Sequence, residues 1–156
     1  MSAAISEKAS LPLRDYGLLG EDARRAVELG LKSAEWYHTD VSRKEMKALM
    51  QRSDMPAIRD TIIWLGLMVV FAAGAIWTWP GLWSIPFLLA YGVLYGSATD
   101  SRWHECGHGT AFKTPWMNDV VYQIACFMIM RNPVTWRWSH TRHHTDTYIV
   151  GLDPEI

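Results

Sequence analysis

The sequence predicts an all-α membrane protein, in which a transmembrane helical hairpin is followed by cytoplasmic interfacial helices that carry two groups of histidines. The charged residues crowd into the first sixty positions and are then absent until Asp100. This uncharged stretch is divided by a single turn sequence, Trp79-Pro80-Gly81. Five of the six histidines lie between His104 and His144, at spacings that place them on common helix faces.

Length and composition limit the classes of protein that the chain could be. Its 156 residues are about one domain, and a net charge of −1 gives no reason to expect a nucleic-acid partner. Cys106 and Cys126 are too few for a disulfide framework or a four-cysteine cluster. No secretory signal is expected at the start. We expect a cytoplasmic tail with short helices over residues 1–53, and a membrane domain over residues 54–156.

The N-terminal part reads as a loose tail to about Gly20 and then two short helices. Glu21 to Tyr37 carries acidic residues in its first turn and small apolar residues along one side, which predicts a helix. Ser42-Arg43-Lys44-Glu45 matches a capping box, so a second helix is expected to run to about Arg52. His38 lies between these helices and is expected to be an exposed loop residue.

Two uncharged runs predict membrane spans at about residues 61–79 and 82–98. The first contains nineteen residues. At ~1.5 Å per residue, a helix of that length covers roughly 28 Å, which is enough to cross the hydrocarbon core. The alternative is a buried pair of helices in a soluble domain, but two such runs in succession are hard to bury in so small a chain.

The basic residues around these runs predict the orientation in the membrane. Lys and Arg residues precede the first uncharged run and follow the second, whereas the turn that connects the two runs has no charge. By the positive-inside rule, the N-terminus and both histidine groups are expected on the cytoplasmic side of a multi-pass protein. The flanking residues are Arg43, Lys44, Lys47, Arg52 and Arg59 before the first run, and Arg102 and Lys113 after the second.

The histidine groups are expected on helices that follow the hairpin. If the second span continues past Asp100 as a helix, it carries the first group into the cytoplasmic interface. Thr114-Pro115 reads as the N-cap and first position of a helix up to about Met130, which is expected to be interfacial or re-entrant. Asn132 and Pro133 then start the helix of the second group.

Imidazoles grouped in this way predict a metal site, although the ligands alone do not select the metal. His104-Glu105-x-x-His108 also matches the H-E-x-x-H pattern of zinc peptidases, in which the glutamate is the general base. The second group adds three more histidines, which is too many for one catalytic zinc, so a redox centre with two metals fits better. Histidines with only a structural role at the interface are the remaining alternative.

The two groups carry a family resemblance in their flanking residues and their order. His104-Glu-Cys-Gly-His108-Gly109 is similar to the first histidine box of acyl-lipid desaturases, and Ser139-His140-Thr-Arg-His143-His144 is similar to the second. From about Thr61 to Ile156 the chain therefore resembles the integral-membrane fatty acid desaturase and hydroxylase superfamily.

This resemblance implies a di-iron enzyme that uses O2 and two electrons to oxidise C–H bonds of an acyl lipid or acyl thioester. It implies that the iron ligands are His104, His108, His140, His143 and His144. Possible carboxylates that orient these rings are Asp100, Glu105, Asp146, Asp153 and Glu155. A ferredoxin or a cytochrome b5-like protein would supply the electrons. A dock for this donor, or contacts with anionic lipid head groups, could be formed by Arg102, Lys113, Arg131, Arg137 and Arg142.

One departure from the family pattern concerns the third histidine box, which follows two more spans in these enzymes and is not in this sequence. We therefore expect the N-terminal portion of such an enzyme, without turnover on its own. The alternatives from other classes are a membrane zinc metallopeptidase that uses residues 104–108 and a non-catalytic membrane element that binds metal.

Overall fold

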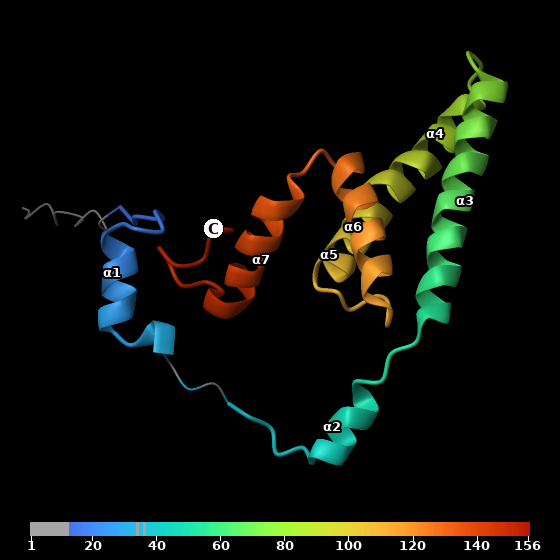
Figure 1. Ribbon diagram of the computed structural model, residues 1–156. Coiled ribbons are helices and arrows are strands. Elements are labelled where there is room, and N and C mark those ends of the chain that lie inside the picture. Colours follow the sequence, from blue (N-terminus) through green and yellow to red (C-terminus); the bar gives the residue numbers. More distant parts are fainter. Residues whose placement is uncertain (1–12, 34, 36) are drawn as a thin grey trace, which may run out of the picture. The chain divides into compact units, whose positions relative to one another are not determined.

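The computed structural model describes residues 13–33, 35 and 37–156, so most of the predicted tail lies outside the described residues. Over the described residues the chain is built from helices and contains no strand, which confirms the predicted all-α class (Figure 1). In chain order the elements are α1 (Glu21–Glu28), the 3-10 helix η1 (Leu31–Ser33), α2 (Arg43–Leu49), α3 (Asp54–Thr78), α4 (Ser84–Val93), the π-helix η2 (Leu94–Ala98), α5 (Thr99–Gly107), α6 (Pro115–Met128) and α7 (Pro133–Asp146).

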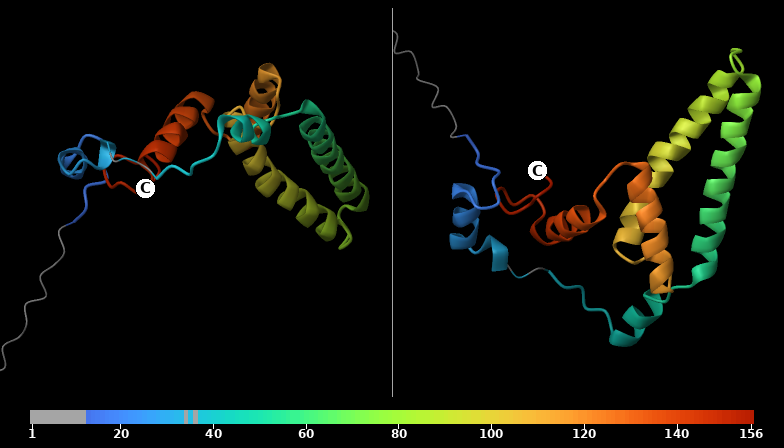
Figure 2. Two further views of the ribbon diagram at one scale, coloured as in Figure 1. Left: turned by 90° about the horizontal axis from the view of Figure 1, so that it is seen from below. Right: turned by 45° about the horizontal axis from the view of Figure 1, so that its top comes forward.

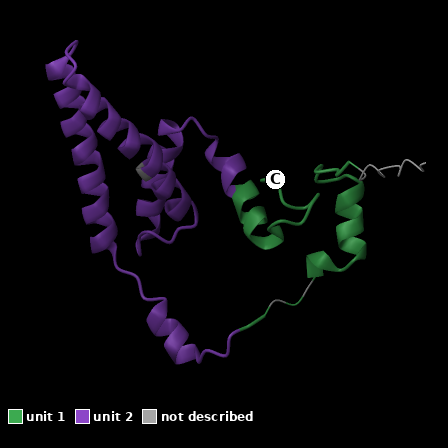
Figure 3. Ribbon diagram, turned by 180° about the vertical axis from the view of Figure 1, so that it is seen from behind, with its two compact units in different colours: residues 1–38, 138–156 green, residues 39–137 purple. Residues whose placement is uncertain are grey.

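The chain divides into two compact units, which are coloured separately in Figure 3. Unit 1 comprises residues 1–38 and 138–156, and unit 2 comprises residues 39–137. The helix α7 begins in unit 2 and ends in unit 1, so one unbroken helix belongs to both. The division into a tail before residue 54 and a membrane domain after it stays a prediction.

Unit 2 begins with α2 and α3, the two helices that precede the turn at Trp79-Pro80-Gly81. The capping box predicted at the start of α2 is confirmed, because the Ser42 side chain accepts a hydrogen bond from the Glu45 N–H and Glu45 reaches back to the Ser42 N–H. One helical stretch of the described residues, Arg43–Thr78, which comprises α2 and α3, has an apolar window long enough to cross a membrane. Its apolar part is α3.

The second apolar run continues without a break into the helix of the first histidine group. α4, η2 and α5 follow one another directly, so the predicted continuation of this helix past Asp100 is confirmed. The π-helical turn of η2 lies between them, and the Trp64 Nε1–H of α3 donates to the Leu94 carbonyl at its start (3.1 Å). α3 and α4 meet at the turn after Thr78 (Figure 2).

The core of unit 2 lies where α5 and α6 pack side by side. Its buried side chains are Ala57, Trp103, Cys106, Phe112, Val121, Tyr122, Ala125, Cys126 and Trp136. The loop between α5 and α6 is held by Asn118, whose side chain accepts from the Phe112 N–H and donates to the Phe112 carbonyl, both at 3.0 Å. The predicted start of α6 is confirmed, with Thr114 at the N-cap and Pro115 in the first turn.

In unit 1 the first helix is shorter than the sequence predicts. α1 ends at Glu28 rather than near Tyr37, and Gly30 follows it with a φ of 74°. Such a φ ends an α-helix and is adopted most easily by glycine. α1 packs through Ala23 and Ala26 against Leu152, in the segment that follows α7.

Candidate metal centre

The first histidine group lies on α5, one helical turn apart. The rings of His104 and His108 meet edge to face, with centroids 4.8 Å apart. Glu105 places Oε1 3.1 Å from the Nδ1 of His104, and its Oε2 accepts a hydrogen bond from the Thr110 hydroxyl at 2.9 Å. The carboxylate of Glu105 is therefore held in place by two neighbours, and one of them is an imidazole of the group.

The electrostatics of this group favour an ionised Glu105. Burial acts to raise the pKa of Glu105, but the hydrogen bonds from His104 and Thr110 outweigh this effect and lower it. This carboxylate stabilises a proton on Nδ1 of His104, which leaves Nε2 available to a metal ion. Burial raises the pKa of the Cys106 thiol to about 11, so this neighbouring thiol is protonated at neutral pH and is a poor metal ligand.

The second histidine group lies on the last turns of α7. The Nε2 atoms of His140 and His144 are 3.1 Å apart, and their rings are perpendicular. The His143 ring lies 5.7 Å from each of the other two, measured between centroids. The three imidazoles thus form one compact cluster, as their spacing predicts.

Two carboxylates return to this cluster from the chain that follows α7. Asp153 contacts the Nδ1 of His143 at 2.9 Å, and Glu155 contacts the Nδ1 of His140 at 3.1 Å. Asp153 is fully buried and also accepts the backbone N–H groups of Tyr148 and Glu155, each at 2.9 Å. Burial acts to raise the pKa of Asp153, but the N–H groups of Glu155 and Tyr148 and the His143 ring lower it.

The five carboxylates named from the sequence therefore divide into two sets. Glu105, Asp153 and Glu155 contact histidines, whereas Asp146 forms an ion pair with Arg142 at 2.9 Å and Asp100 lies exposed in the first turn of α5. Sequence reasoning missed Thr110, which supports Glu105. Its place two residues after His108 was the only signal.

The donor set of the second group fits a metal ion. Carboxylates at Nδ1 of His140 and His143 leave Nε2 of each ring available to a metal ion. Two nitrogen ligands at ~2.0–2.1 Å from one metal are roughly 3 Å apart at the usual bond angles. The 3.1 Å between the Nε2 atoms of His140 and His144 matches this separation.

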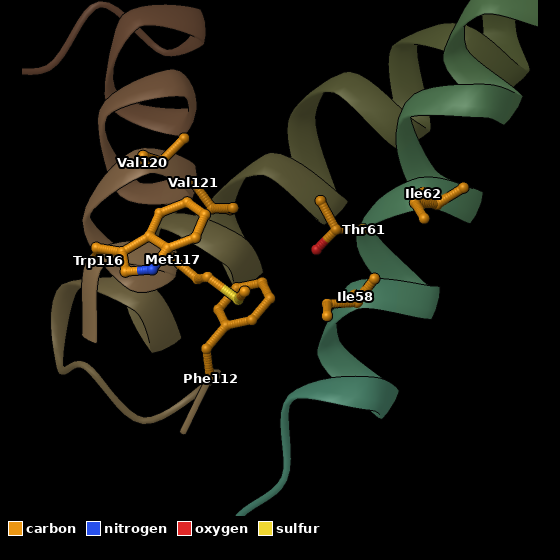
Figure 4. Close-up of a pocket in the computed structure, with 8 residues that line it drawn as sticks. All are labelled: Ile58, Thr61, Ile62, Phe112, Trp116, Met117, Val120 and Val121. Atoms are coloured by element: carbon orange, nitrogen blue, oxygen red, sulfur yellow. The ribbon is translucent and has the colours of Figure 1, made fainter. Parts of the chain in front are cut away.

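Unit 2 also contains an apolar pocket, which is drawn in Figure 4. Its volume is about 300 Å³, and it lies between the first turns of α3, the loop before α6 and α6 itself. Thr61 supplies the one hydroxyl among its lining side chains (Figure 4). The lining residues are Ile58, Thr61, Ile62, Phe112, Trp116, Met117, Val120 and Val121.

Each group of imidazoles, with carboxylates behind its rings, is a candidate site for a metal ion. The family model described as fatty acid desaturase matches residues 77–156, which is just over half of the chain. The chain belongs to this family.

Relatives with known names agree with the family model. The chain is 30% identical over 99 residues to the Delta(12) fatty acid desaturase fat-2 of Caenorhabditis elegans, and this alignment covers 64% of the chain and 22% of that protein. It is 37% identical over 66 residues to the omega-6 fatty acid desaturase, endoplasmic reticulum isozyme 1, of Glycine max. This alignment covers 40% of the chain and 17% of that protein. A Delta(12) fatty acid desaturase of Calendula officinalis is 29% identical over 75 residues, or 48% of this chain and 18% of that protein.

These alignments span about a fifth of the length of the relatives. No solved structure matches the chain.

Proposed function

We propose that this chain supplies the first two histidine boxes of a membrane di-iron fatty acid desaturase or hydroxylase, which oxidises C–H bonds of acyl chains with O2. The observation that carries the proposal is the second histidine group. Its Nε2 atoms lie at the spacing of ligands on one metal, and buried or half-buried carboxylates hold the opposite ring nitrogens. The proposed ligands are His104, His108, His140, His143 and His144.

One feature supports the proposal that both groups serve one centre. The continuity of α7 gives a physical reason, because Trp136, His140 and His144 recur at intervals of four residues and so lie along one face of a single helix. At the start of this face, the Trp136 ring lies 6.5 Å from that of His104, within unit 2.

The position of Glu105 favours this proposal over a zinc peptidase. A peptidase of the H-E-x-x-H type needs its glutamate directed at a metal-bound water as general base. Here the carboxylate is bonded to the Nδ1 of His104 and to the Thr110 hydroxyl, on the side of the ring away from Nε2. This is the arrangement expected of a residue that orients a ligand.

Iron would supply the redox chemistry with O2 that zinc lacks. The residues of the chain would bind and orient it: five imidazoles as ligands, with Glu105, Asp153 and Glu155 fixing the protonation of three of them. The apolar pocket of Figure 4 has the chemistry of a site for a hydrocarbon chain, which supports an acyl lipid or acyl thioester as substrate.

The proposal includes the membrane setting. Large apolar side chains are exposed along α3 and α4, for example Ile76, Leu89 and Val93, at 78%, 66% and 66%. Such faces suit contact with lipid or with further spans. We propose that the apolar runs at about residues 61–79, on α3, and 82–98, through α4 and η2, form the transmembrane hairpin, with the N-terminus and the histidines on the cytoplasmic side and α6 at the interface.

Electrons would come from an external donor such as a ferredoxin or a cytochrome b5-like protein. Of the basic residues proposed as its dock, three are already engaged within their own units. Arg131 lies over the Trp103 ring, Arg137 pairs with Asp119, and Arg142 pairs with Asp146. Arg102 and Lys113 are the better candidates for contact with an acidic partner or with lipid head groups.

Metal analysis of the complete gene product tests the proposal. We expect two irons per chain, whereas one zinc per chain would indicate the peptidase. Substitution separates the two classes further. Glu105→Gln should leave part of the desaturase activity, and His143→Ala should remove it. In a zinc peptidase, Glu105→Gln would abolish activity because the base is lost.

A further inference from the structure

We propose that the N-terminal helix α1 is a working part of the second histidine group, because it clamps the turn that places Asp153 against His143. This inference rests on the proposed metal site. α1 lies outside residues 77–156, the part that matches the family model, and all of its contacts described below lie within unit 1. The proposal assigns a positioning role to residues of α1 and to Gly151.

The contact between α1 and this turn is a close approach of two backbones. A Cβ added to Gly151 would lie 2.5 Å from the Ala23 N atom and 2.9 Å from the Ala23 Cα. Gly151 also has a φ of 81°, which an L side chain rarely adopts. Glycine is therefore required here both for its backbone conformation and for the space that it leaves to α1.

Small side chains on α1 complete the interface. Ala23 and Ala26 are buried, and they pack against Leu152, which is also buried, and against Ile149. The start of α1 is fixed by Asp15, whose carboxylate accepts the N–H groups of Gly17 (2.9 Å) and Glu21 (3.0 Å). The helix thus presents a defined apolar face to the turn rather than a loose segment.

A short chain of contacts leads from this interface to the imidazole. The N–H groups of Leu152 and Asp153 both donate to the Ile149 carbonyl at 3.0 Å, which closes the turn. Asp153 follows Leu152 directly and contacts the Nδ1 of His143. The Asp153 carboxylate holds a proton on Nδ1 of His143 and so leaves Nε2 available to a metal ion. A shift of the turn away from α1 would move Asp153 and remove this effect.

The first test needs no metal and compares Gly151→Ala with Gly30→Ala in the full chain. Gly30 has a similar φ of 74°, but a Cβ there would meet nothing within 4 Å, so Gly30→Ala shares the backbone strain without the clash. The backbone N–H groups of Tyr148 and Glu155 donate to the Asp153 carboxylate. Gly151→Ala should increase the hydrogen-exchange rate of these two amides by about tenfold or more. Gly30→Ala should leave them as in the wild type, and equal exchange in all three proteins would overturn the proposal.

The second test measures Co2+ affinity as a probe of the imidazoles, in a double-mutant cycle with Asp153→Asn. Gly151→Ala and Asp153→Asn should each weaken Co2+ binding by about tenfold or more, the usual effect of losing a residue that orients a ligand. If α1 acts through Asp153, the double variant should bind no more weakly than Asp153→Asn alone. The proposed role of α1 would be contradicted if the losses of Co2+ affinity in the two single variants added up in the double variant. Wild-type Co2+ affinity in Gly151→Ala would contradict it as well.

The two tests separate this inference from the proposed function. A wild-type chain that binds no Co2+ contradicts the metal site, whereas amide exchange still decides whether α1 holds the turn. If Gly151→Ala loses its helical circular dichroism signal, Leu152→Ala takes its place, because it removes a buried contact with α1 without a clash. Leu152→Ala should also weaken Co2+ binding, and unchanged binding with unchanged exchange would overturn the proposal.

Discussion

The carboxylate of Asp54 accepts two hydrogen bonds from Thr114, one from its N–H at 2.8 Å and one from its hydroxyl at 2.7 Å. Asp54 is the first residue of α3, and Thr114 is the N-cap of α6, whose side chain makes no capping bond to its own helix. One carboxylate therefore joins the start of the apolar helix to the start of the helix that packs on the first histidine group.

Loss of this link should lower stability in a way that depends on pH. The Thr114 hydroxyl and N–H lower the pKa of Asp54 below its ordinary value of 3.8. Because the folded-state pKa is the lower one, the stabilisation is complete above the unfolded-state value and is lost as pH falls through the folded-state value. Asp54→Ala should therefore lower the midpoint of thermal unfolding at pH 6, and the gap from the wild type should narrow toward pH 3.

Thr114→Val serves as the partner experiment, because it removes the hydroxyl and keeps the N–H bond to Asp54. Its midpoint should fall between those of the wild type and Asp54→Ala at pH 6, with the same trend toward acid. A gap of constant size from pH 6 to pH 3 would show that Asp54 acts through packing rather than through its charge.

A side chain at Gly107, between the two histidines of the first group, should be costly. A Cβ there would lie 2.3 Å from the Trp136 ring and 3.2 Å from the Tyr122 ring, both in the core of unit 2. Gly107→Ala should destabilise the protein by ~1–3 kcal/mol, as expected for overpacking. Gly66→Ala in α3 is the control, since a Cβ there meets nothing within 4 Å and should stabilise the helix by up to ~1 kcal/mol. Chemical unfolding in detergent micelles gives both values, and equal stabilities would contradict the packing.

The bond between Trp64 and η2 gives a third prediction. Trp64→Phe removes the N–H that satisfies the Leu94 carbonyl at the start of the π-helix and keeps most of the ring. The free energy of unfolding should fall by ~0.5–1.5 kcal/mol, the net contribution of one hydrogen bond. Trp77→Phe, at a side chain that is 90% exposed on the same helix, should change it little. Equal losses in the two variants would show that the bond contributes nothing.

Features that depend on a few neighbouring residues were predictable from the sequence. The Ser42–Glu45 capping box is present, and Asn132 accepts the N–H groups of Val134 and Thr135, each at 3.0 Å, as a helix cap should. Helical spacing likewise predicted that His140, His143 and His144 form one cluster. These signals are local, so tertiary packing does not change them.

Features that depend on distant residues were not predictable. Five carboxylates near the histidines looked equivalent in the sequence, and only the turn through Gly151 brings Asp153 and Glu155 back to α7. The link between Asp54 and Thr114 spans sixty positions and has no sequence signature. The π-helix η2 is the last part of a run that reads as an ordinary span, because its composition does not distinguish i→i+5 from i→i+4 bonding.

The 3.1 Å between the Nε2 atoms of His140 and His144 gives the last prediction, which concerns stabilisation by metal. A ligand present at ~100 times its Kd stabilises the folded state by ~2.7 kcal/mol. His144→Ala removes one of the paired nitrogens, and a tenfold weaker affinity would reduce the stabilisation at the same Co2+ concentration to about 1.4 kcal/mol. His38→Ala, at an exposed histidine outside both groups, should keep the full effect. Thermal unfolding of the three proteins with and without Co2+ measures this difference. An identical response in His144→Ala and His38→Ala would mean that the 3.1 Å pair is not a ligand pair.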